Sequence, residues 1–350
     1  MKARKCVLLF RKSAKNNSHF ILSSMKKKYQ NIFFVFGLVL LLLMLTQLDL
    51  SQVLAGLKRA GYWFGAAIVL WGVLYMLNSS AWYLIIKSGN NGKSDIKFWW
   101  LYKVTISGFA LNYTTPSGLM GGEPYRIMSL SPKIGTERAS SSVILYAMTH
   151  IFSHFWYWLL SVILFVACRP VNLFMGIMLA CIAAFCILCL WLFLKGYKGG
   201  IAMRAMRILR HLPLIKKWAR KYIESHKEQL DTIDHQIAAL HSQSRNTLVS
   251  AVLLELLCRF LNSFEIFFIL LVITPNVNFI DCVFILAFTS MFANMLFFLP
   301  LQLGGREGGF VMSAASLGLT AGAGIFVALI VRLRELIWTA IGLLLIKIKE

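Results

Sequence analysis

Several apolar runs in this chain are long enough to cross a lipid bilayer, and they limit what it can fold into. A helix needs about 20 apolar residues to span the hydrocarbon core, and backbone polar groups inside that core must be hydrogen-bonded within the protein. Hydrophobic residues make up 58% of the 350 residues, and the mean hydropathy is +0.70. The sequence therefore predicts an all-α fold, a polytopic membrane helix bundle.

Basic residues concentrate in two polar segments that flank apolar runs. The formal net charge is +22; residues 1–31 carry nine Lys and Arg without an acid, and residues 195–245 carry eleven against four acids. Cytoplasmic loops carry such an excess, and anionic lipid headgroups attract it. We therefore assign the charge to membrane topology and lipid contact, and expect no nucleic acid as a partner. The expected location is the inner membrane of a bacterium, with the N-terminus cytoplasmic.

Hydropathy divides the chain into a basic cytoplasmic tail, residues 1–31, and one transmembrane domain, residues 32–346. The first span has no signal-peptide cleavage site, which favours a retained signal anchor. Residues 49–61 are predicted at the membrane interface, and residues 195–245 are predicted to form a cytoplasmic amphipathic helical insert. The predicted apolar segments are Ile32–Leu48, Trp63–Ile86, Phe98–Thr115, Ala139–Ala167, Val171–Leu194, Thr247–Ile273, Phe279–Leu299 and Ala321–Ile346.

The positions of the basic loops give the topology. Charge places both Lys87–Lys97 and the insert 195–245 inside, and two long spans separate this insert from the Gly-rich stretch 116–137. That stretch is therefore also inside, so Phe98–Thr115 enters and leaves on the same side. The same count makes Phe279–Leu299 re-entrant from the opposite side. We predict about six full spans and two re-entrant half-helix hairpins that form an inverted repeat, as in many transporters.

Each predicted hairpin contains a proline followed by a Gly-Gly pair beside an acid and an arginine. Successive N–H groups at such glycines form anion-binding nests, and arginine adds a bidentate phosphate partner. The alternative is that the glycines only permit close helix packing. The candidate headgroup-binding residues are Asn112, Pro116, Gly121, Gly122, Glu123 and Arg126 in the first hairpin and Asn294, Gly304, Gly305, Arg306 and Glu307 in the second.

The last two long apolar segments contain charged residues. Unpaired, each costs about 2.5–3.5 kcal/mol at the membrane centre, so they must be paired, neutralised or hydrated. Sequence spacing places one pair four apart and another three apart, which suggests either structural ion pairs or a polar route through the bundle. Arg334, without a local partner, and Arg259 are the stronger phosphate candidates. The charged residues are Glu255, Arg259, Glu265, Arg332, Arg334 and Glu335, and all except Glu265 join the predicted substrate-binding set.

Two histidines lie four residues apart in one span, as two metal ligands might. No third ligand is evident for His150 and His154, so hydrogen bonding to a neighbouring helix is favoured. The CxxC spacing of Cys186 and Cys189 lies inside an apolar run, where packing is the better interpretation. No metal and no cofactor is predicted.

These motifs resemble the lysylphosphatidylglycerol synthase transmembrane-region family of flippase-like membrane proteins. The resemblance rests on the two Gly-rich stretches and on Arg332, and it covers roughly residues 30–346. It implies kinship with the membrane half of the multiple peptide resistance factors, which moves aminoacylated phosphatidylglycerol to the outer leaflet. A soluble synthase domain joins that half in these relatives. Because this chain ends at Glu350 without one, the resemblance favours lipid translocation over lysyl transfer.

Three functions remain open from the sequence. The first is a flippase that moves a phosphate-bearing lipid through a hydrated cleft between the two hairpins. The second is a lipid-modifying enzyme with its site in the same cleft, and the third is a non-transporting partner of a separate synthase. The expected partners are a membrane phospholipid or an isoprenoid phosphate, together with anionic headgroups at the basic segments. A homodimer is one alternative for the oligomeric state.

Overall fold

The protein is an all-helical membrane bundle. The computed structural model describes residues 50–88, 96–114, 121–196, 245–295 and 305–348, and these contain helices without strands. The predicted tail, the span Ile32–Leu48 and most of the amphipathic insert lie outside the described residues. The helices are α2 (Leu50–Ser88), α3 (Phe98–Thr114), α4 (Gly122–Ile134), α5 (Thr136–Cys168), α6 (Leu173–Gly196), α10 (Arg245–Leu271), α11 (Phe279–Met295), α12 (Gly305–Ser316) and α13 (Ala321–Lys347).

Five of these helices run the length of the bundle. In α2, α5 and α6, the segments Ala55–Ser88, Thr136–Cys168 and Leu173–Leu194 are long and apolar enough to cross a membrane. The helices α10 and α13 have 27 residues each but carry the internal charges. The predicted spans Thr247–Ile273 and Ala321–Ile346 thus form single helices.

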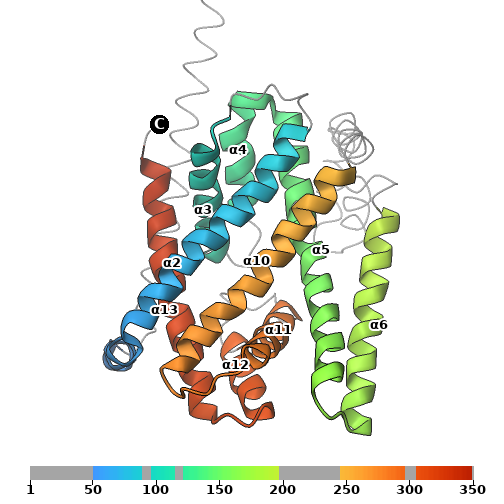
Figure 1. The fold of residues 1–350 in the computed structure, drawn as a ribbon. Coiled ribbons are helices and arrows are strands. Elements are labelled where there is room, and N and C mark those ends of the chain that lie inside the picture. Colours follow the sequence, from blue (N-terminus) through green and yellow to red (C-terminus); the bar gives the residue numbers. More distant parts are fainter. Residues whose placement is uncertain (1–49, 89–95, 115–120, 197–244, 296–304, 349–350) are drawn as a thin grey trace, which may run out of the picture.

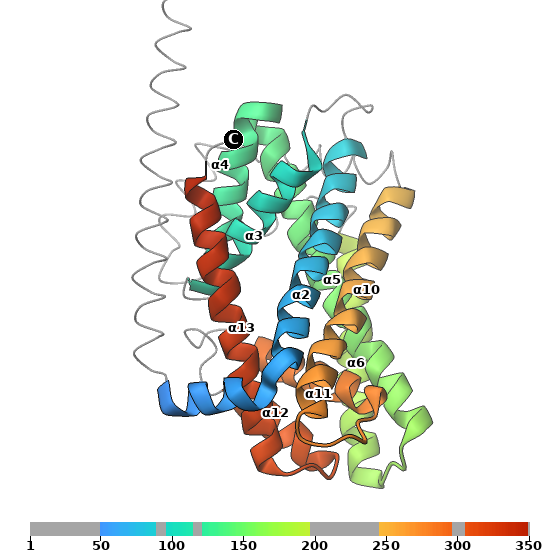
Figure 2. The same ribbon diagram turned by 60° about the vertical axis from the view of Figure 1, so that its left-hand side comes forward.

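The helix α2 bends where the predicted interfacial segment meets the span. Gly61 has φ +53°, a left-handed conformation that residues with a Cβ rarely adopt. Before this glycine, the blue start of α2 runs across the lower end of the bundle, and after it the helix climbs through the bundle (Figure 2). This is the orientation expected of a helix that lies at a membrane interface before it enters.

Two hairpins of short helices enter the bundle from opposite ends. The pair α3 and α4 lies at the upper end and the pair α11 and α12 at the lower end (Figure 1). The helices have 17, 13, 17 and 12 residues, too short to span the hydrocarbon core. The opposed hairpins agree with the predicted re-entrant arrangement. Their tips, residues 115–120 and 296–304, lie outside the described residues.

Hydrogen bonds tie the helix ends together at each end of the bundle. At the upper end, Arg138 donates to the carbonyl of Ile86 at 3.1 Å, so α5 begins beside the end of α2. At the lower end, Arg169 pairs with Asp281, so α5 ends beside the start of α11. The upper end therefore collects the end of α2, the start of α5 and the C-terminal end of α13 (Figure 1), which the sequence predicts to be cytoplasmic.

Small residues let α13 pack directly on α3. A Cβ at Gly342 would lie 2.5 Å from the Cβ of Ala110 and 2.9 Å from the carbonyl oxygen of Ile106. The hydroxyl of Ser107 donates to the carbonyl of Gly342 at 3.0 Å. Close backbone approach of this kind replaces the hydrophobic effect as the force that associates helices in lipid. It fixes the first hairpin against the last span.

Cysteine labelling tests the arrangement of the ends. In a variant without the seven native cysteines, we expect Glu137→Cys and Lys347→Cys to react with a membrane-impermeant maleimide from one side only. Asn276→Cys, in the loop before α11, should react only from the other side, because an odd number of spans separates it from both. Reaction of all three from one side would contradict the fold.

Candidate functional site

In the first hairpin, Asn112 joins the two short helices. Its side-chain oxygen accepts from the Gly122 N–H at 2.7 Å, and its amide donates to the Glu123 carboxylate at 3.0 Å. This satisfies an N–H group at the start of α4 that has no partner within the helix. A Cβ at Gly122 would lie 2.2 Å from the Gly108 carbonyl oxygen. Glycine is therefore required here for close packing, the structural alternative that the sequence left open.

Arg126 is buried beside this contact, with 2% of its side chain exposed. Its guanidinium lies 4.6 Å from the ring centroid of Phe109 and 5.3 Å from that of Tyr146. Its contact with Glu123 is long, at 3.4 Å, and its Nε has no hydrogen-bond partner in the described part of the chain. Aromatic faces thus stabilise much of this charge through cation–π contact.

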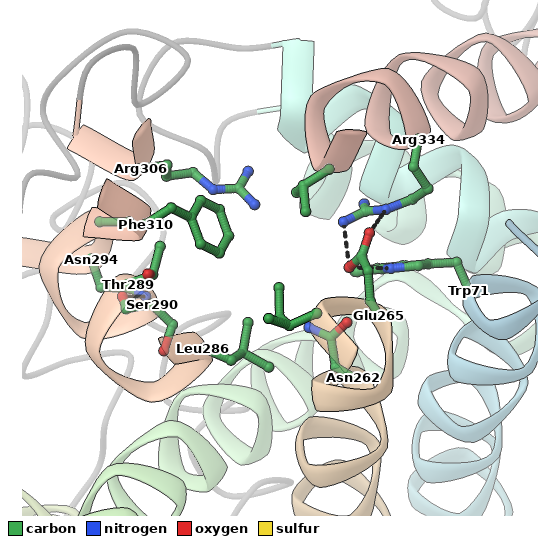
Figure 3. Close-up of a pocket in the computed structure, with 13 residues that line it drawn as sticks. Trp71, Asn262, Glu265, Leu286, Thr289, Ser290, Asn294, Arg306, Phe310 and Arg334 are labelled. Atoms are coloured by element: carbon green, nitrogen blue, oxygen red, sulfur yellow. Dashed lines mark hydrogen bonds and ion pairs between the residues drawn. The ribbon is translucent and has the colours of Figure 1, made fainter. Parts of the chain in front are cut away.

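In the second hairpin, α11 and α12 border a cavity of about 160 Å³. Figure 3 shows Arg306 and Phe310 on one side of this cavity and Arg334, Glu265 and Trp71 on the other. Such a volume holds several waters, because one water needs only ~10–15 Å³ of it. The remaining lining residues are Asn262, Ile266, Leu286, Thr289, Ser290, Ala293, Asn294 and Val331.

The cavity differs in place from the predicted cleft. Its described lining residues come from α2, α10, α11, α12 and α13, and none comes from α3 or α4. The sequence predicted a cleft between the two hairpins, whereas the described lining of this cavity includes the second hairpin and not the first. The first hairpin is filled by Arg126 and its aromatic neighbours, whereas small and polar residues of α11 leave space beside the second.

A bidentate ion pair forms the far wall of the cavity. Arg334 donates from Nε and Nη2 to the two Glu265 oxygens at 2.7 and 2.9 Å, and both side chains are 2% exposed. Trp71 donates from Nε1 to Glu265 at 2.8 Å, and its ring lies 3.8 Å from the Arg334 guanidinium. The sequence spacing gave Arg334 no local partner, and its bidentate partner comes from α10 rather than from its own helix.

Two further ion pairs join α12 to α13. Arg306 pairs with Glu335 at 2.5 Å, and Arg332 pairs with Glu307. The spacing within α13 suggested that Arg332 and Glu335 belong together, but each instead pairs with a residue of α12. Glu335 also lies 3.7 Å from Arg334. Acidic and basic side chains of α12 and α13 therefore pair across the contact between these two helices. The same contact places Arg306 at the cavity.

A separate polar cluster lies between α5 and α10. Glu255 contacts Nδ1 of His150 at 2.7 Å. Arg259 donates to the Ser153 hydroxyl at 2.8 Å and to the His150 carbonyl at 2.7 Å. The sequence spacing suggested a direct pair of Glu255 with Arg259, whereas both contact α5 instead. The prediction that the two histidines bond a neighbouring helix was correct for His150, whereas Nδ1 of His154 is buried and has no hydrogen-bond partner among the described residues.

The predicted site residues therefore lie in three places: in the first hairpin, around the second hairpin with its cavity and α13, and in the cluster between α5 and α10. Of those not yet placed, Gly121 precedes α4, Gly305 begins α12, and Asn294 lines the cavity. Pro116 and Gly304 lie outside the described residues. Sequence analysis noticed Glu265 as an intramembrane charge but left it out of the site, and it missed Trp71 and Asn262. The signal for Asn262 was its spacing from Arg259 on α10, which places both on one face.

Sequence comparison identifies the family. The lysylphosphatidylglycerol synthase TM region matches residues 32–342, nearly the whole chain. The chain belongs to this family. It is a multi-pass membrane protein, and its family is described as the transmembrane region of a lipid synthase. Neither the curated proteins nor the solved structures contain a match.

The close approach at the first hairpin gives a stability prediction. Gly122→Ala should lower stability by about 1–3 kcal/mol, because its Cβ would overlap the Gly108 carbonyl and Asn112. Gly308→Ala in α12 is the matched control, since its Cβ would come no closer than 3.9 Å to a neighbour. Thermal unfolding in detergent measures both variants. Equal unfolding temperatures would contradict close packing at Gly122.

The buried ion pair gives a second stability prediction. Arg334→Met should cost about 3–5 kcal/mol, because it leaves the Glu265 charge buried without a partner. Adding Glu265→Gln should recover part of this loss, since the amide is neutral and keeps an oxygen for Trp71. Arg169→Gln, at a pair whose arginine is 39% exposed, should cost only about 0–1 kcal/mol. If thermal unfolding shows that Arg334→Met and Arg169→Gln destabilise the protein equally, this account is contradicted.

Proposed function

We propose that this protein translocates a phosphate-bearing lipid, an aminoacyl-phospholipid or a polyprenyl phosphate, between the leaflets of a bacterial inner membrane. The observation that carries the proposal is Arg306, which a half-length hairpin brings into a cavity within the membrane bundle. Broken helices at such depth are tolerated where they line a cavity, and they hold the substrate in many transporters. Family membership supports a lipid as the substrate.

Ion-pair exchange allows Arg306 to take a headgroup. At rest its guanidinium contacts Glu335, and a phosphate offers a bidentate alternative with more negative charge. When Arg306 turns to the phosphate, the Glu335 carboxylate still has a cationic neighbour, because the Arg334 guanidinium lies 3.7 Å from it. No carboxylate is then left buried without a partner, which would otherwise be costly. The bidentate contact with Glu265 holds Arg334 in place meanwhile.

The walls of the cavity suit a polar headgroup with its acyl chains outside. The polar residues Asn262, Thr289 and Ser290 are among those that line the cavity, and Asn294 is exposed. The outer surface of α6 is apolar, with Phe174, Leu188 and other side chains exposed as expected for contact with lipid. Hydrocarbon chains can therefore stay in the bilayer while the headgroup passes through the bundle.

A translocation assay tests the proposal. Proteoliposomes containing tail-labelled fluorescent phosphatidylglycerol should lose fluorescence to external dithionite faster than protein-free vesicles. Arg306→Gln should slow this by roughly tenfold or more, because a hydrogen bond to a charged group contributes about 1.5–3 kcal/mol. Arg169→Gln, which breaks an ion pair at the lower end of the bundle, should leave the rate unchanged.

Two results would contradict the proposed function. One is a wild-type rate equal to that of protein-free vesicles. The other is equal slowing by Arg306→Gln and Arg169→Gln, which would show that the cavity arginine has no special role. A chemically altered lipid, detected by mass spectrometry in the same vesicles, would instead favour the lipid-modifying enzyme.

A further inference from the structure

Polar residues form a stripe along α10 that connects the cavity with the α5–α10 cluster. Glu255, Arg259, Asn262 and Glu265 recur at steps of three and four residues, so they lie on one side of the helix. Ten residues separate the first from the last, a rise of about 15 Å. Polar side chains of α10 inside the bundle therefore extend over about half the thickness of the hydrocarbon core. The cavity accounts only for the lower end of the stripe.

At the upper end of the stripe, His150 connects a buried carboxylate with accessible space. Its side chain is 32% exposed, whereas Glu255, which contacts its Nδ1, is 1% exposed. Among the described residues, nothing hydrogen-bonds its other nitrogen, Nε2. The Glu255 Oε1 atom is buried, and no described residue lies in hydrogen-bonding geometry to it. The pair therefore has one face against the protein interior and one that a proton donor can reach.

The surroundings of His150 are charged on one side and aromatic on the other. From α10 it faces Glu255 and Arg259, beside which lies Cys258, and from its own helix Tyr146 and His154. The nearest group from α3 is the ring of Phe109, at 5.9 Å between centroids, and beyond this ring lies Arg126 of α4. From α2, Asn78 reaches the Cys258 sulfur.

We propose that His150 is a proton-binding site that couples lipid translocation to a proton gradient. This rests on the proposed function and names its driving ion. Histidine is the side chain whose charge ordinarily changes between about pH 5 and 8. Ionisable residues inside membrane bundles form proton relays in pumps and transporters. The exposed face of His150 gives the proton access, and the contact with Glu255 stabilises the charge that it brings.

The proton step conserves charge and atoms. With neutral imidazole, Nδ1–H donates to the Glu255 carboxylate, and Nε2 accepts one proton from water. The cluster of Glu255, His150 and Arg259 then changes from a net charge of zero to +1. An anionic headgroup in the polar stripe restores neutrality, and its departure favours return of the proton to water. Proton and headgroup binding thus favour one another, as linkage requires.

Gradient-driven transport in proteoliposomes tests the coupling. The vesicles contain pyranine as a pH reporter and tail-labelled fluorescent phosphatidylglycerol, and a pH step of either sign is imposed across the membrane. We expect wild-type protein to translocate faster under one sign of the gradient and to admit protons as it does so.

His150→Gln should lose both responses but still equilibrate lipid at equal pH. His154→Gln is the matched control, because it removes an imidazole four residues away and leaves the His150–Glu255 contact intact.

A second variant keeps the test decisive if His150→Gln unfolds. Glu255→Gln retains the imidazole but removes its anionic partner, so the difference in translocation rate between the two signs of the gradient should shrink. Thermal unfolding reports whether each variant is folded. A wild-type rate indifferent to the gradient, or a His150→Gln variant that responds as wild type does, would overturn the proposal. If wild-type protein moves no lipid at all, the proposed function fails, while His150-dependent proton entry would still support the proton site.

Discussion

Charge inside hydrocarbon is the constraint on which the rest of this structure depends. Each ion costs several kcal/mol unless another group compensates it. The bundle compensates charge between helices: Glu265 of α10 holds Arg334 of α13, and Glu335 of α13 holds Arg306 of α12. Because a break between Glu265 and Arg334 leaves a buried charge, and Arg306 and Glu335 join α12 to α13, these contacts hold both the last span and the second hairpin. The charged side chains that make the interior of the bundle polar also join its helices.

The two hairpins use their glycines and arginines differently. In the first, Gly108 and Gly122 allow such close approach that Arg126 is enclosed by aromatic rings and a carboxylate. In the second, Gly309 lies against Thr289, and Arg306 keeps 23% of its side chain exposed beside the cavity. An inverted arrangement of elements therefore does not produce two equal sites. In the described residues, packing closes one hairpin and leaves space beside the other.

The polar stripe on α10 gives this asymmetry a functional meaning. It begins at Glu255, beside His150, whose ring contacts Phe109 of the closed hairpin, and it ends at Glu265, in the wall of the cavity beside the open one. A helix with a polar face can remain in the membrane only because α2, α5 and α13 cover that face with partners. The same cover keeps the stripe away from lipid, so a headgroup or a proton meets polar groups rather than acyl chains. The proposed transport and its proposed driving ion are thus two uses of one helix face.

The sequence by itself determined the fold class, the length of the helices and the opposed hairpins. Apolar length, proline and glycine act locally, and the location of Lys and Arg relative to them fixes the order of entry and exit. It also singled out Asn112, Gly122 and Arg126, which do lie together. Only the tertiary structure decided which charges are paired, because partners such as Glu265 and Arg334 lie 69 residues apart. It likewise decided where the cavity lies, since unfilled space depends on how side chains from five helices meet.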